Sequence, residues 1–317
     1  MLIATLTAAS CVVGVFVAAR RAADAVPRVD GVADFVRQVV DHHKLPTRVH
    51  ATTDRREVLE GADYVVVAIA VGGPAYNGVP YYWEIEVPKK YGVSQQVADT
   101  VGVGGVFRTL RTAPEMLRIC RDMEELCPKA WLINYTNPMS MLCWAMYKAT
   151  KIKGVGLCHS VQGTHNQLCG FLGIPANQAT RWVAGINHQS WFLRFEKRGS
   201  AWSQGEDLYP ALFEAAKNPE IFNKEAVRFE IMKHFGYFVT ESSGHNSEYN
   251  WWFRKRPDLI ERYCTHGTGW NPGIYAYILN EYMKREGSWQ TEIEKWLAED
   301  TIDLARGHEY AAYIFNA

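Results

Sequence analysis

The first half of the chain alternates short apolar runs with segments in which apolar residues recur at helical spacing. The run 63–70 (DYVVVAIA) is followed by Gly72 and Gly73. An apolar run of this length indicates a strand buried on both faces of a parallel sheet, with its carboxyl end opening into a glycine loop. We expect the same structure for 130–135 (AWLINY) and for 154–157 (GVGL).

Helical segments separate these strands. Apolar residues recur every three or four positions in 32–43 and 113–126, and 138–147 carries a proline near its start, as the first turn of a helix permits. The segment 48–53 alternates like a short strand. This order of elements predicts an α/β fold with a Rossmann-like, doubly wound parallel sheet, as in lactate and malate dehydrogenases.

From about Ala176 the pattern changes to alternating apolar and polar residues, as in 191–196 (WFLRFE), and to long amphipathic segments. This pattern predicts that a mixed α+β domain follows the first one. With 317 residues the chain is long enough for two packed cores. We therefore expect a first domain over 1–155 and a second over 156–317.

The first nineteen residues are almost all small or apolar and precede Arg20 and Arg21. They superficially resemble a signal peptide or a short membrane span. The stretch has no positively charged start and is interrupted by Thr5, Thr7 and Ser10. We therefore expect a buried first strand instead.

Charge and cysteine content narrow the class of protein. The 34 basic and 34 acidic residues balance, which argues against nucleic acid or a membrane surface as partner and favours a small-molecule ligand. The seven cysteines are odd in number, scattered, and include no CxxC pair. We expect a protein of the reducing cytoplasm rather than a disulfide framework.

Polar residues follow the ends of three predicted strands: the glycines after 63–70, the segment 134–138 (NYTNP), and Cys158 with His159. Ligands bind at the carboxyl ends of strands in an open parallel sheet, so these ends should converge in one cleft. Cys158 and the later His188 look like two halves of a metal site. A lone Cys and a lone His are more often packing residues, so spacing alone leaves both interpretations open.

Four segments resemble glycoside hydrolase family 4, in that family's order and at its approximate spacing. They are 98–105 (ADTVGVGG), 134–139 (NYTNPM), 158–164 (CHSVQGT) and 185–188 (GINH). The tetrad CHSV and the later segment 237–249 look like the alpha-galactosidase branch of the family.

The resemblance implies an alpha-galactosidase that needs NAD and a divalent metal, typically Mn²⁺. In the family's mechanism NAD⁺ takes a hydride from C3 of the sugar, a base removes the C2 proton, the leaving group is eliminated, and water is added before the hydride returns. The metal holds the C2 and C3 oxygens and stabilises the enediolate. Cys158 and His188 match the metal ligands, so 1–155 would bind NAD and 156–317 would bind metal and sugar.

The same resemblance implies further site residues. His245 is the first candidate for the C2 base and Tyr249 the second, because a tyrosine would need a lowered pKa. His159 is a candidate for protonating the leaving oxygen, or else it orients the site. Residues expected to contact the cofactor are Ile69, Gly72, Gly73, Asn134 and Thr136. Residues expected to contact the sugar are Asp99, Arg108, Asn137 and Asn187.

Each of these roles has a plainer alternative. An asparagine in a turn usually serves the turn itself, and Asp99 and Arg108 could pair at the surface. Two features also depart from the family: the segment 1–46 has no glycine-rich phosphate turn, and the chain ends early, so we expect truncation at both ends.

The alternatives for function follow from these departures. They are an alpha-glucosidase or alpha-galacturonidase of the same family, a lactate or malate dehydrogenase-like oxidoreductase, and an inactive family remnant. If the C-terminal portion is present, we expect a homodimer or homotetramer.

Overall fold

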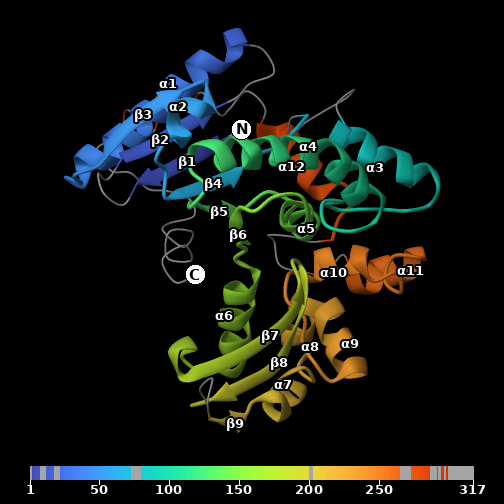
Figure 1. Cartoon of the computed structure of the whole chain (residues 1–317). Coiled ribbons are helices and arrows are strands. Elements are labelled where there is room, and N and C mark those ends of the chain that lie inside the picture. Colours follow the sequence, from blue (N-terminus) through green and yellow to red (C-terminus); the bar gives the residue numbers. More distant parts are fainter. Residues whose placement is uncertain are drawn as a thin grey trace. The chain divides into compact units, whose positions relative to one another are not determined.

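The computed structural model describes six continuous stretches of the chain and a few residues after them. These are residues 2–7, 12–17, 22–72, 80–199, 203–264 and 273–285, followed by 291, 294–295 and 298. The chain (Figure 1) divides into two compact units. Unit 1 comprises Met1–Tyr81, Gly105–Leu157 and Glu281–Ala317, and unit 2 comprises Tyr82–Gly104 and Cys158–Asn280.

The units are interleaved along the chain, whereas the sequence predicts two successive domains with one change at 155/156. The structure has a change between Leu157 and Cys158, but the earlier segment Tyr82–Gly104 also belongs to unit 2. A segment belongs to the unit whose groups it contacts, wherever it lies in the sequence. Here the carboxylate of Glu248 accepts hydrogen bonds from the backbone of this earlier segment.

The sheet of unit 1 has the strand order β3-β2-β1-β4-β5-β6. The strands are β1 (Leu2–Thr7), β2 (Val12–Val17), β3 (Arg48–Thr52), β4 (Tyr64–Ala68), β5 (Trp131–Asn134) and β6 (Lys153–Gly156). β2 and β3 are parallel, as are β4, β5 and β6, whereas β1 is antiparallel to both neighbours. The carboxyl ends of all strands except β1 therefore lie at the same edge of the sheet.

The N-terminal segment corrects the expectation of one first strand in a wholly parallel sheet. It forms two strands, and only residues 8–11 separate them. A parallel connection needs a dozen or more residues, so this short connection permits only an antiparallel pair. The other five strands share one direction, and the Rossmann-like α/β fold is confirmed.

Four helices accompany this sheet along the chain. They are α1 (Ala22–His42), α2 (Arg55–Leu59), α4 (Gly102–Leu126) and α5 (Met139–Ala149). Met116, Ile119 and Met123 lie on one face of α4 and form a core with Val67 of β4 and Leu132 of β5. Each such buried side chain stabilises the fold by about 1.5–3 kcal/mol relative to an exposed one.

Unit 2 is a mixed α+β structure, as the pattern after Ala176 predicts. Its antiparallel strands are β7 (Ala179–Ile186), β8 (Gln189–Lys197) and β9 (Glu206–Asp207). The remaining helices are α3 (Pro80–Lys90), α6 (Ser160–Leu172), α7 (Tyr209–Ala215), α8 (Pro219–Phe222), α9 (Ala226–Phe235), α10 (Ser243–Tyr249), α11 (Pro257–Leu259) and α12 (Tyr277–Arg285), with short helical turns η1 (Ala176–Gln178), η2 (Asn223–Glu225) and η3 (Ile260–Cys264).

The core of unit 2 lies between β8 and the neighbouring helices. Phe192 and Phe195 of β8 are fully buried and pack with Phe229 of α9 and Leu168 of α6. This packing holds the start of α6 and the hairpin β7–β8 in one rigid cluster. None of the described helices is long and apolar enough to cross a membrane.

Candidate metal centre

His188 lies in the tight turn between β7 and β8. It has a φ of 63° and is only 6% exposed. Nearby Gly185 has a φ of 140°, and a Cβ there would lie 2.5 Å from the Cα of Ser190, so the position needs glycine. A left-handed non-glycine residue costs of the order of 1–3 kcal/mol and persists where its surroundings hold it, often at functional sites. The GINH segment thus builds a strained turn with its imidazole buried.

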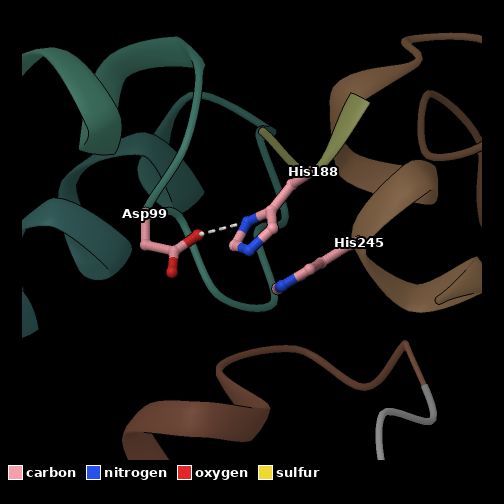
Figure 2. Close-up of side chains that lie close together, drawn as sticks. All are labelled: Asp99, His188 and His245. Carbon is pink, nitrogen blue, oxygen red and sulfur yellow. Dashed lines mark ion pairs between the residues drawn. The ribbon is translucent and has the colours of Figure 1, made fainter. Parts of the chain in front are cut away.

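The Nδ1 atom of His188 is held by Thr100. The hydroxyl oxygen of Thr100 lies 2.7 Å from Nδ1 and donates its hydrogen to Asp99 Oδ1 at 2.9 Å. Because a hydroxyl has one hydrogen, Nδ1 must be the donor to Thr100. Asp99 Oδ1 itself lies 3.9 Å from Nδ1 (Figure 2). The neutral ring then carries its lone pair on Nε2, the tautomer that can bind a metal through this atom.

Glu248 on α10 fixes the loop that carries Asp99. Its carboxylate accepts backbone N–H hydrogen bonds from Gln96 at 2.6 Å, Val97 at 3.1 Å and Ala98 at 3.1 Å. Ala98 has a φ of 55°, a conformation that turns successive N–H groups toward one anion. Glu248 therefore acts as a bound anion that sets the position of the neighbouring Asp99.

The Nε2 atom of His188 faces the carboxylate of Glu241, and the thiol of Cys158 belongs to the same cluster. Nε2 lies 3.6 Å from Glu241 Oε2, and one potential ligand atom from each of the three residues falls within 4.8 Å of the others. Cys158 precedes α6, and its sulfur accepts the N–H of Ser160 at 3.5 Å. The two residues that the sequence pairs as metal ligands thus lie together in unit 2.

A second group of potential ligands shares His188. Asp99, His188 and His245 also offer ligand atoms within 4.8 Å of one another (Figure 2). In this group Asp99 faces Nδ1, which Thr100 already engages. The donor set on the Nε2 side, a thiolate with an imidazole and a carboxylate, therefore fits a divalent cation better.

The electrostatics of this cluster favour a positive charge. Burial lowers the pKa of His188, but Cys158, Glu241 and Asp99 outweigh it and raise this pKa to about 10. Burial raises the pKa of Glu241, and His245, His188 and other cations bring it below its usual value. The negative groups thus stabilise a cation among them, which is the condition that a metal site requires.

His245 and Tyr249, the candidate bases, lie beside the cluster on α10. The ring of His245 is 4.8 Å from that of His188 and 5.6 Å from that of Tyr249. His245 is buried, and its Nδ1 has no hydrogen-bond partner among the described residues. Burial of the hydroxyl, followed by Asp99 and Glu248, raises the pKa of Tyr249 well above its usual value. The assignment of His245 or Tyr249 as the base stays a prediction.

Sequence reasoning missed three members of this site. Glu241 is the carboxylate beside Nε2 of His188, Thr100 fixes Nδ1, and Glu248 holds the loop before Asp99. A signal for Glu241 was present, because it is the one acidic residue in the small polar run 240–244 (TESSG). The contacts of Thr100 and Glu248 join segments far apart in the chain, which no local pattern reveals.

Three predicted cofactor contacts lie at the ends of β4 and β5 in unit 1. The hydroxyl of Thr136 accepts the N–H of Ile69 at 2.9 Å. The amide of Asn134 donates to the carbonyl of Thr136 at 3.1 Å, and its oxygen accepts the N–H of Thr136 at 2.9 Å. Both side chains are almost fully buried, so they serve the turn, the plainer alternative for Asn134. Their contact with a cofactor stays a prediction.

Other predicted contacts are divided between the units. Gly72 has a φ of 89°, and Gly73 lies outside the described residues. In unit 1, Asn137 accepts the N–H of Met139 at 3.3 Å, and the guanidinium of Arg108 lies 4.2 Å from the ring centre of Tyr81.

In unit 2, Asn187 lies half-buried in the turn beside His188, and His159 is the N-cap residue of α6, where its side chain makes no capping hydrogen bond. The predictions that Asn137, Arg108 and Asn187 bind the sugar, and that His159 protonates the leaving oxygen, stay predictions.

Known proteins resemble this chain over most of its length. An alpha-galactosidase of Bacillus subtilis (strain 168) is 45% identical over 284 residues, which are 87% of this chain and 61% of that protein. An alpha-galactosidase of Rhizobium meliloti (strain 1021) is 38% identical over 290 residues, 90% of this chain and 57% of that protein. The chain thus spans about three fifths of the length of these relatives.

Solved structures share the fold. A 6-phospho-alpha-glucosidase from gut microorganisms, in complex with NAD and Mn²⁺, superposes with a TM-score of 0.72 at 18% identity, covering 96% of this chain and 66% of that one. A putative glucosidase from Bacillus subtilis gives a TM-score of 0.69 at 24% identity, covering 86% of this chain and 63% of that one.

Two family models cover most of the sequence. The model of family 4 glycosyl hydrolases matches residues 22–174, and the model of the C-terminal domain of the same family matches residues 183–317. Together they include the turn of His188, the loop of Asp99 and the start of α6 at Cys158. The chain belongs to family 4 of the glycosyl hydrolases.

Proposed function

We propose that this protein hydrolyses alpha-galactosides with the help of NAD⁺ and a divalent metal, Mn²⁺ in the first place. The proposal rests on the cluster of Cys158, His188 and Glu241, which lies within a chain 45% identical to an alpha-galactosidase. The tetrad CHSV at Cys158 also resembles that branch of the family. Unit 1 is assigned to NAD⁺, and unit 2 to the metal and the sugar.

The arrangement of the parallel strands in unit 1 suits the binding of a dinucleotide. The carboxyl ends of β2, β4, β5 and β6 lie at one edge of the sheet, where nucleotides bind in doubly wound folds. The residues between β2 and α1, Ala18-Ala19-Arg20-Arg21, supply no glycine for close approach of a pyrophosphate. These four residues lie outside the described part of the chain. Without a glycine here we expect NAD⁺ to bind more weakly than to a glycine-rich turn.

The donor set of unit 2 suits a divalent cation, with Cys158 and His188 as the residues that hold it. When bound, the metal and NAD⁺ would supply Lewis acidity toward the sugar oxygens and a hydride acceptor. The protein's own part is orientation. Asp99 and Thr100 fix His188 in the tautomer that presents Nε2, and Glu248 holds the loop from which they act.

His245 is assigned as the base that removes the C2 proton. Its buried Nδ1 has no hydrogen-bond partner among the described residues, and its ring lies beside His188. A histidine acts as a base near neutral pH without a large change of pKa. Tyr249 is the weaker candidate, because its environment raises its pKa. His159 is assigned to the leaving oxygen.

The substrate is a small sugar, and we place the protein in the cytoplasm, where its scattered cysteines stay reduced and NAD is available. We further propose a homodimer or homotetramer, to be measured by light scattering. A mass of one chain, 36.0 kDa, would overturn the oligomer and leave the activity untouched.

The activity is tested with a panel of nitrophenyl alpha-glycosides in the presence of NAD⁺, Mn²⁺ and a thiol reductant. We expect release of nitrophenol from the alpha-galactoside, dependence on both additions, and no net NADH. Preference for the alpha-glucoside or alpha-galacturonide would reassign the sugar. Accumulation of NADH when a hydroxy acid is supplied would indicate a dehydrogenase. Failure to bind NAD⁺ at millimolar concentration would indicate an inactive remnant of the family.

A further inference from the structure

We propose that Glu241 is a third protein ligand of the cation held by Cys158 and His188, and that it binds through Oε2. This inference rests on the proposed metal dependence and adds to it a residue that completes the ligand set. A thiolate, an imidazole and a carboxylate together leave the remaining positions of a six-coordinate ion open for two sugar oxygens and water.

The arrangement of His188 decides which groups can share the ion. Its Nδ1 donates to Thr100, so only Nε2 can bind a metal. The atom nearest to this nitrogen among the carboxylates is Glu241 Oε2, at 3.6 Å. Atoms that are each about 2.0–2.2 Å from one ion lie roughly 2.8–3.1 Å apart at the 90° angle of a six-coordinate site and roughly 3.3–3.6 Å apart at the tetrahedral angle. The observed separation is therefore close to that of two ligands of the same ion.

The unused oxygen of Glu241 points to the same conclusion. The side chain is only 4% exposed. Its Oε1 accepts the N–H of Ser242 at 3.3 Å, whereas the buried Oε2 has no hydrogen-bond partner among the described residues. A buried carboxylate oxygen is normally satisfied, so an oxygen left open toward a thiol and an imidazole is suited to a cation.

The backbone holds Glu241 in this position. Glu241 has a φ of 68°, a strained conformation for a residue with a side chain. On one side, the hydroxyl of Thr240 accepts the N–H of Ser190 at 3.1 Å, which ties it to β8 just after His188. On the other, Glu225 accepts the N–H of Ser243 at 2.9 Å. The chain is thus anchored directly before Glu241, at Thr240, and two residues after it, at Ser243.

Glu225, which holds the backbone at Ser243, is itself part of a buried ion pair. Glu225 pairs with Arg228 at 2.8 Å, and both side chains are almost fully buried. Arg228 also donates to Thr164 on α6 at 3.0 Å. Because α6 begins directly after Cys158, the same network connects the segments that carry two of the three ligands.

The test measures metal binding rather than turnover. Titration of Mn²⁺, followed by the electron paramagnetic resonance signal of the free ion, is compared for wild type, Glu241→Gln and Glu196→Gln. Glu196 is a buried carboxylate of the same unit that pairs with Arg194, outside the cluster. We expect at least a tenfold loss of affinity in Glu241→Gln and less than a twofold change in Glu196→Gln. Wild-type affinity in Glu241→Gln would overturn the proposal.

The absorption spectrum of bound Co²⁺ separates a ligand from a residue that only orients one. We expect altered d–d bands in Glu241→Gln, and unchanged bands with weaker binding in Thr100→Val, which loses the partner of Nδ1. Identical spectra for wild type and Glu241→Gln would assign Glu241 to orientation and overturn its role as a ligand.

A second variant covers the case in which Glu241→Gln does not fold. Glu241→His supplies another metal-binding side chain, so we expect Co²⁺ binding with a new spectrum; loss of binding in this folded variant would refute the ligand role. Wild-type cleavage of alpha-galactosides, measured in parallel, tests the proposed function separately. The proposed function would stand even if Glu241 proved not to be a ligand.

Discussion

His188 is the residue on which the site depends, because both of its ring nitrogens have assigned tasks. Thr100 holds Nδ1, and Nε2 faces Glu241. The ring is placed by a left-handed turn residue, so its position depends on the hairpin rather than on a rotamer choice. Substitution of any residue that contacts this ring should therefore change the affinity for the metal.

Removal of the thiol tests the metal site most directly. Cys158→Ser replaces a thiolate ligand by a neutral hydroxyl, so we expect Mn²⁺ affinity to fall about 100-fold or more and turnover to be lost. The circular dichroism spectrum should stay that of the wild type, because the thiol is half-buried and packs in neither core. Near-normal turnover in metal-depleted buffer would contradict the prediction.

The raised pKa of His188 leads to a prediction of how the thermal stability of the metal-free protein depends on pH. The negative groups raise the pKa of His188 to about 10, above the 6.5 of a free histidine. A pKa raised by folding contributes stability that is complete below the unfolded value and is lost as pH rises through the folded one. We expect the thermal unfolding midpoint to decline between pH 6.5 and about 10. His188→Gln should flatten this decline; an equal decline in the variant would refute its origin.

At the scale of elements, the loop before α4 and the helix α10 act as one structure. The carboxylate of Glu248 on α10 accepts three backbone N–H groups, from Gln96, Val97 and Ala98. Asp99 and Thr100 follow directly, so a local contact of α10 determines the placement of groups at His188. The conformation of this loop is therefore held by the carboxylate of Glu248 and not by regular secondary structure.

Substitution of this carboxylate should destabilise the protein and weaken metal binding together. Glu248→Gln removes the negative charge from hydrogen bonds that each contribute roughly 1.5–3 kcal/mol, so we expect a loss of about 2–3 kcal/mol in urea unfolding. Glu214→Gln is the control, because Glu214 is exposed and pairs with Lys217, which lies two residues beyond the end of α7. Its effect should stay within about 0.5 kcal/mol. Equal effects of both substitutions would contradict the role of Glu248.

The extent of the elements shows where sequence patterns succeed and where they stop. The predicted strand over 48–53 and helix over 138–147 match β3 and α5 within about two residues. Helix α4 begins at Gly102, well before the predicted start at 113, and continues through Pro114. In the first turns of α4, Val106 and Phe107 are exposed. The apolar residues of these turns therefore do not recur at the spacing of a helix face packed on a core, and the sequence pattern carries no signal for a helix here.

At the scale of the whole molecule, metal binding and folding are coupled within unit 2. The groups around the candidate site come from four separate segments of the chain, carried by Asp99, by Cys158, by His188, and by Glu241 with His245. An ion that joins such segments binds the folded protein and not the unfolded chain. Its binding energy therefore adds to the stability of this unit.

Added Mn²⁺ should accordingly raise the thermal stability of the wild type. At a free concentration 100 times the dissociation constant, binding stabilises the folded state by about 2.7 kcal/mol. We expect an increase of several degrees in the unfolding midpoint, measured by scanning calorimetry, and no increase in Cys158→Ser. A shift of the same size in this variant would place the ion elsewhere.

The sequence by itself determined the class of fold, the family, and the pairing of Cys158 with His188. Hydrophobic periodicity and motif order are local properties, so they can be recognised without coordinates. Only the tertiary structure decided the antiparallel direction of β1, the assignment of 82–104 to unit 2, and the positions of Glu241 and Thr100 beside His188. These depend on which segments form strands and on contacts between distant segments, which exist only once the chain has folded.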